Sequence, residues 1–108
     1  MSEELINKFR ISGGSYYDRD RQAISKTEAA EVTVTNVRLI IEYAHRETRQ
    51  IFLHDIIGIE SQAGLLRPKM VRVHLTGQLS VDVRCNGRGE VRRIIAALNE
   101  AIVSQVPE

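Results

Sequence analysis

The stretch EVTVTNVRLIIEY at residues 31–43 decides the fold class of this 108-residue chain. Val32 and Val34 alternate with threonines, and the same period of two resumes after Asn36 and continues to Tyr43. Alternation of β-branched and polar residues is typical of a strand with one buried face. Asn36 interrupts the pattern, which predicts either a tight turn between two strands or a bulge in one bent strand.

The residues that follow extend the β pattern. The polar segment 44–50 is typical of a hairpin loop, and short strands are predicted at 50–54 and near 58–61. Residues 70–85 form the clearest hairpin pattern in the chain, because apolar residues alternate on both sides of the Thr76–Gly77–Gln78 turn.

The apolar period changes near the C-terminus. Beyond Asn86 the large apolar residues recur at steps of three and four: Val91, Ile94, Ile95, Leu98, Ile102 and Val106. This spacing predicts an amphipathic helix over 89–105 that ends before Pro107. We expect its apolar stripe to pack on the open face of the sheet.

The first thirty residues carry a weaker pattern. Residues 3–9 (EELINKF) are interpreted as a short helical turn, and the first strand is expected between Tyr16 and Ser25. We therefore expect one domain over 1–108, with an N-terminal extension at 1–15, strands over 16–85 and a helix at 89–105.

Composition excludes several function classes. Fifteen Lys and Arg against fourteen Asp and Glu give a formal charge of +1, which argues against nucleic acid as a partner. A single cysteine excludes an intramolecular disulfide and a multi-cysteine zinc site. No apolar run approaches the length of a membrane-spanning helix, so we expect a cytoplasmic protein.

Two phrases in the sequence resemble a known family. They are VTVTNVRLII at 32–41 and RQIFLHDIIGIE at 49–60. Their order and spacing resemble bacterial pleckstrin-homology-like (PH-like or GRAM-like) domains, with these matching residues: Thr35, Asn36, Arg38, Leu39, Ile40, Leu53, Asp55, Ile56 and Ile59. The likeness covers about residues 16–106. It implies a mostly β protein: a PH-like barrel of about seven antiparallel strands capped by one C-terminal amphipathic α-helix.

The resemblance supports a fold more than a ligand, since domains of this kind bind lipids, peptides or proteins. Lipid-binding PH domains carry a basic cluster around the first hairpin loop. Here the corresponding candidates are Lys26, Arg46 and Arg49, and Glu28 and Glu47 dilute their charge. Weak binding of phosphoinositide or an anionic membrane surface is therefore the alternative function.

A second anion candidate lies at the start of the predicted helix. Arg88, Arg92 and Arg93 cluster beside two glycines, whose backbone amides suit an anion. The other interpretation is that Glu90 and a neighbouring carboxylate offset these arginines. Both interpretations are open from the sequence.

The sequence indicates no catalytic site, metal or cofactor. The histidines are His45, His54 and His74, and none has metal-ligand spacing to another histidine or to the cysteine. Cys85 continues the apolar register of its strand, so we expect a buried thiol and not a nucleophile. We expect a protein that is not an enzyme.

An interaction surface is the remaining candidate. Ile40, Phe52 and Ile57 fall on the face opposite the buried register or break the alternation, which leaves apolar side chains on a second face. One interpretation is that Leu5 and its neighbours Ile6 and Phe9 cover them. The other is a homodimer or a partner protein. We expect a non-catalytic interaction module that acts through protein contacts or self-association.

Overall fold

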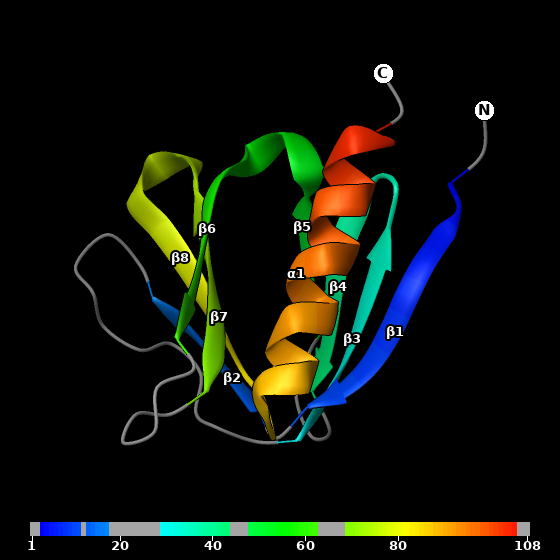
Figure 1. Cartoon of the computed structure of the whole chain (residues 1–108). Helices are drawn as coiled ribbons and strands as arrows, with labels where there is room; N and C mark the ends of the chain where they lie inside the picture. Colours follow the sequence, from blue (N-terminus) through cyan, green and yellow to red (C-terminus); the bar gives the residue numbers. More distant parts are fainter. Residues whose placement is uncertain (1–2, 12, 18–28, 44–47, 63–68, 106–108) are drawn as a thin grey trace.

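The computed structural model describes residues 3–11, 13–17, 29–43, 48–62 and 69–105 (Figure 1). These ranges contain the following elements in order: β1 (Leu5–Ile11), β2 (Gly13–Tyr17), β3 (Ala30–Thr35), β4 (Arg38–Tyr43), β5 (Thr48–Phe52), the 3₁₀ turn η1 (Leu53–Asp55), β6 (Ile56–Gln62), β7 (Met70–Leu75), the 3₁₀ turn η2 (Thr76–Gln78), β8 (Leu79–Arg84) and α1 (Arg88–Val103). The predicted mostly β chain with one C-terminal helix is confirmed.

The strands form two antiparallel sheets. The first has the order β1-β3-β4-β5 and the second the order β2-β8-β7-β6. β1 and β2 follow one another in the sequence but belong to different sheets, and the described ranges contain eight strands where about seven were expected. β5 and β6 are sheet edges, and no strand pairing in the described ranges closes the sheets into a barrel.

The core lies between the sheets and α1, which stands along their open side (Figure 1). Alternate strand residues point inward, and the fully buried ones are mostly valine, leucine and isoleucine. The helix adds a stripe at helical spacing: Val91, Ile94, Ala97, Leu98 and Ala101. The predicted amphipathic helix is confirmed, with bounds at Arg88 and Val103.

Asn36 lies in a tight turn between β3 and β4, so the first of the two interpretations is confirmed and the bulge is not. The Oγ1 atom of Thr35 accepts hydrogen bonds from the backbone N–H groups of Val37 and Arg38, at 3.1 and 3.0 Å. A threonine hydroxyl that caps the following amides is a side-chain mimic of a backbone turn. The predicted hairpin at 70–85 is also confirmed, and Gly77 supplies the left-handed conformation (φ 79°) that its turn requires.

The interpretation of the N-terminus was wrong. Residues 3–9 contain no helical turn, and β1 and β2, which begin within the expected extension at 1–15, each form a sheet edge. Phe9 and Ile11 are two residues apart and both point into the core, which is strand spacing. The apolar residues Leu5, Ile6 and Phe9 fit helical spacing equally well, and pairing with β3 decided between the two.

Candidate functional site

The motif that carries the family resemblance forms a polar network, here called the N-terminal clamp: Glu3, Thr35, Asn36, Arg38 and Gln50. The Arg38 guanidinium donates two hydrogen bonds to the Glu3 carboxylate, both at 2.8 Å, and a third to Gln50 at 2.6 Å. Thr35 Oγ1 donates to Glu3 at 2.6 Å. The Asn36 side chain accepts from the backbone N–H of Glu4 at 2.7 Å.

Electrostatics agree with a structural role for the clamp. Hydrogen bonds from Arg38 and then from Thr35 lower the pKa of the Glu3 carboxyl, and Glu3 raises the pKa of Arg38. Every polar group named here is directed at another part of the same chain. The clamp therefore fastens the residues before β1 to the β3–β4 turn and to β5.

The predicted interaction residues differ in their exposure. Ile57 is 67% exposed and Phe52 is 39% exposed, whereas Ile40 is partly buried in the middle of the first sheet's outer face. The Phe52 ring stacks on the His54 imidazole with centroids 5.7 Å apart. The N-terminal segment does not cover Phe52 and Ile57, because β1 lies at the far edge of the sheet and Leu5 is itself 61% exposed.

Five large hydrophobic side chains are exposed in the described ranges, and they share one end of the molecule. We call them the apolar end surface: Leu5, Phe52, Ile57, Ile102 and Val103. The strand register places Leu5 opposite Thr35 and Phe52 opposite Arg38, on either side of the β3–β4 turn. Figure 1 shows the last turn of α1 at the same end, where β5 passes through η1 into β6.

Sequence reasoning missed three of these residues. Leu5 was expected to cover the interaction surface and not to belong to it, yet it is exposed. Ile102 and Val103 belong to the last turn of α1, and Ile102 was assigned to the buried stripe of the helix. It is 38% exposed, and Figure 1 shows the last turn of α1 near the ends of the strands. The helical period predicts which residues share a face but not where the sheet beneath that face stops.

The two ends of the molecule differ in charge. Glu100 lies in the last turn of α1, a turn without a basic residue, where the negative end of the helix dipole adds to its charge. Glu4 and Asp55 lie at that same end. The first turns of α1, at the opposite end, carry the exposed side chains of Arg88, Arg92 and Arg93.

These three arginines, the second anion candidate, are thus on one element. Beside them, the Glu90 carboxylate accepts a hydrogen bond from the backbone N–H of Asn86 at 2.8 Å and stands within the first turn. A carboxylate at this position offsets part of the positive charge.

The first anion candidate is only partly described. Lys26 and Arg46 lie outside the described residues. Arg49 lines a pocket of about 190 Å³ between β5 and the β7–β8 hairpin, and Asp55 lines the same pocket. The adjacent carboxylate makes this a mixed-charge site and not a concentrated basic one.

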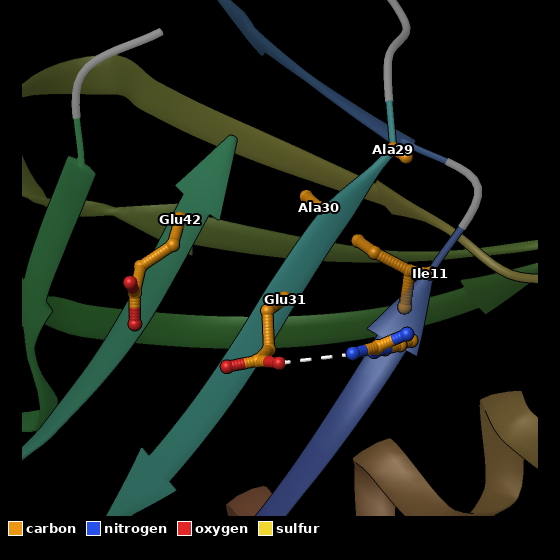
Figure 2. Close-up of a pocket in the computed structure, with 6 residues that line it drawn as sticks. Ile11, Ala29, Ala30, Glu31 and Glu42 are labelled. Atoms are coloured by element: carbon orange, nitrogen blue, oxygen red, sulfur yellow. Dashed lines mark ion pairs between the residues drawn. The ribbon is translucent and has the colours of Figure 1, made fainter. Parts of the chain in front are cut away.

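A second pocket, of about 340 Å³, opens at the far ends of β1, β3 and β4 (Figure 2). Figure 2 shows Glu31 and Glu42 side by side on neighbouring strands, with a dashed ion pair from Glu31 to Arg10 at 3.9 Å. Lys8 approaches Glu31 more closely, at 3.0 Å, and these two carboxylates raise the Lys8 pKa, Glu31 foremost. The Glu31 carboxylate of this pocket is therefore already paired with Lys8 and Arg10 of the same chain.

The outer face of the second sheet carries two polar pairs that the sequence did not indicate. The Arg72 guanidinium donates to both carboxylate oxygens of Asp82, at 2.6 and 2.9 Å, and Asp82 is only 2% exposed. On the neighbouring strands β6 and β7, the His74 ring pairs with the Glu60 carboxylate. Period-two alternation assigned these residues to the solvent face, but it does not show which polar residues pair.

Three further observations concern metal ligands, the thiol and membrane spans in the described part of the chain. There, no group of three or more His, Cys, Asp or Glu is arranged to hold a metal ion. Cys85 is buried, as predicted, and burial, with a smaller effect of Glu90, raises the pKa of its thiol to about 12. Among the same residues, no helix is both long and apolar enough to cross a bilayer.

Comparisons by sequence and by structure give different results. No protein-family model matches this chain, and no curated protein matches it. The C-terminal domain of an unknown protein from Leishmania infantum superposes with a TM-score of 0.68 at 12% identity, over 93% of this chain and 85% of that one.

A structure of Vav1, solved with an allosteric inhibitor that blocks its GEF activity, superposes with a TM-score of 0.69 at 11% identity. The match covers 97% of this chain and 28% of the Vav1 chain. At such identities the likeness shows the fold alone. Vav1 contains a PH domain, so the comparison supports a PH-like fold for this chain, in agreement with the two sheets and the C-terminal helix.

Proposed function

We propose that this protein is a non-catalytic PH-like interaction module that binds another protein through its apolar end surface. One observation carries the proposal: the five large hydrophobic side chains exposed in the described ranges gather at one end. Single exposed hydrophobic residues are ordinary, whereas several on elements that meet at one end of a molecule suit an interaction site. The bacterial origin, the closed barrel and the cytoplasmic location implied by the sequence belong to the same proposal.

The surface is held by the scaffold beneath it. Phe52 and Ile57 flank η1, whose Leu53 is buried in the core and donates its backbone N–H to the carbonyl oxygen of Val37 at 3.0 Å. Ile102 follows the buried Leu98 and Ala101 on α1. A fixed apolar surface binds with a smaller loss of conformational entropy than a mobile one.

The gain from covering the surface is sufficient for moderate affinity. Burial of a large apolar side chain contributes about 1.5–3 kcal/mol. Ile57 is two-thirds exposed and Phe52 about two-fifths exposed, so a partner that covers both gains about 1–2 kcal/mol from Ile57 and about 1 kcal/mol from Phe52. These two side chains are the expected binding hot spots.

Self-association through the same surface is the second form of the proposal. In that case, a mass well above 12.2 kDa is expected by light scattering, rising over a hundredfold range of concentration. The alternative function is weak binding of phosphoinositide or an anionic membrane through Lys26, Arg46 and Arg49. That function predicts salt-sensitive binding to anionic vesicles that Arg46→Glu with Arg49→Glu removes.

The decisive experiment is site-specific photo-cross-linking in the native cells. A photoreactive amino acid is placed at Ile57, at Phe52, or at the exposed control position Ala96 on the outer face of α1. We expect a discrete adduct from the first two positions only, lost when Val103→Asp is added to the chain. A monomer without an adduct specific to Phe52 or Ile57 would show that the surface has no partner.

A further inference from the structure

We propose that the occupant of the apolar end surface is a protein segment whose apolar side chains are flanked by lysine or arginine. This inference rests on the proposed function and names the chemistry of the partner. It is argued from the charges around the surface, from the opposite end of the molecule and from the helix that links them.

Carboxylates surround the apolar end surface. Glu4 directly precedes Leu5, Asp55 lies between Phe52 and Ile57 in sequence, and Glu100 precedes Ile102 on α1. Glu4 and Glu100 are exposed, and the Asp55 side chain is 45% exposed. The negative end of the α1 dipole lies at this end as well, and no basic residue in the last turn offsets it.

The cations at this end are already engaged. Arg38 donates to Glu3 twice and to Gln50 once within the N-terminal clamp, so Glu3 offsets its charge. His54 lies 3.6 Å from Asp55 and stacks on Phe52. Arg49 lines the same pocket as Asp55, so it offsets that carboxylate. The exposed carboxylates of Glu4 and Glu100 thus leave a negative field beside the apolar side chains, which attracts a basic partner and repels an acidic one.

A second copy of this chain fits the surface less well. The end of that copy with Arg88, Arg92 and Arg93 would supply cations for the carboxylates beside the apolar end surface. Yet none of the exposed large hydrophobic residues in the described ranges lies on that end, so a head-to-tail contact would leave the apolar side chains without an apolar counterpart. A segment with both basic and apolar side chains satisfies both requirements.

The probes for the test are three synthetic peptides of equal length. One carries leucines at helical spacing flanked by lysines, the second has every lysine replaced by glutamate, and the third keeps the lysines but has serine in place of leucine. Binding to the full chain is followed by ¹⁵N–¹H correlation spectra and fluorescence anisotropy at 50 and 500 mM NaCl.

We expect the lysine–leucine peptide to bind about tenfold more tightly than the other two at low salt, since it alone offers both apolar side chains and cations for the carboxylates. Shifted resonances should map to Ile57, Phe52 and Glu100. Glu100→Lys with Glu4→Lys should remove most of the preference for lysine, and high salt should have the same effect on the wild type. Ala96→Lys with Asn99→Lys is the matched charge control.

The outcomes separate this inference from the proposed function. If lysine and glutamate peptides bind equally and Ile57→Asp abolishes both, the apolar surface is an interface but its preference for basic partners is refuted. If Ile57→Asp changes nothing, the proposed function fails as well. If the mass rises with concentration and Arg88→Glu with Arg92→Glu reverses it, the occupant is a second copy and the inference is overturned.

Discussion

The N-terminal clamp yields the most direct test of how this fold is held. Replacing Glu3 with glutamine keeps the size of the side chain but removes its charge, and with it the two charge-assisted hydrogen bonds from Arg38. The side chains of Arg38 and Glu3 are 31% and 29% exposed, so solvent screens the pair in part. We expect Glu3→Gln to lower the free energy of unfolding.

The magnitude lies between two limits. A hydrogen bond to a charged group contributes about 1.5–3 kcal/mol when buried, and an exposed ion pair contributes about 0.2–1 kcal/mol. For this half-buried, two-pronged pair we expect about 1 kcal/mol. In a domain of about 100 residues, that loss lowers the melting temperature by about 4–8 °C.

The pH dependence has a definite sign. Because the folded-state pKa of Glu3 is lowered from its ordinary value of 4.5, its contribution to stability is fully present above that value. It is lost as the pH falls through the folded-state pKa. The difference in melting temperature between the wild type and Glu3→Gln should therefore be constant from pH 8 to 6 and shrink below pH 4.5.

Circular dichroism melts over this pH range are the assay, with a double-mutant cycle that adds Arg38→Gln. Arg10→Gln is the control, because Arg10 forms only a long contact of 3.9 Å with Glu31 and its side chain is 92% exposed. Equal melting temperatures for Glu3→Gln and the wild type at pH 7, or a difference that grows in acid, would refute the reasoning.

Three further substitutions or treatments test the remaining structure. Leu98→Ala, at a fully buried position of α1, should lower the free energy of unfolding in urea by about 2–5 kcal/mol. The control Ile102→Ala, at an exposed position, should lower it by less than about 1 kcal/mol. Similar losses for the two variants would mean that α1 does not cover the core. Asp82→Ala removes a nearly buried carboxylate from Arg72 and should cost about 2–3 kcal/mol by the same assay, and a neutral result would contradict the paired geometry. Cys85 should resist alkylation at pH 8 in the native protein and react within minutes in urea, as followed by mass spectrometry; rapid native labelling would show that the thiol is not buried.

Most strands could be predicted from the sequence because one face of each is buried and the other is not. The 31–43 and 70–85 patterns contain this contrast within themselves, and so does the helix that follows. The first strand does not. Leu5, Ile6 and Phe9 fit two periods, and only pairing with a distant strand decides between them.

The candidate site was predicted in part for the same reason. Phe52 and Ile57 break the local alternation, which marks them in the sequence as out of register. Ile102 follows the helical period without a break, so nothing local shows that it is exposed, and Val103 lies outside the apolar stripe. Asp82 is similar: its burial depends on Arg72 in the neighbouring strand, and strand register is a tertiary property.

The position of β2 has a consequence for the order of events during synthesis. Gly13 pairs with Arg84, so a strand that leaves the ribosome among the first finds its partner only 71 residues later. At about 5–20 residues per second, the wait is about 4–14 s, during which the second sheet has no completed edge. Folding of this chain is therefore expected to finish only after translation has passed β8, and a ribosome stalled before that strand would hold β2 without a partner strand while β1 already pairs with β3.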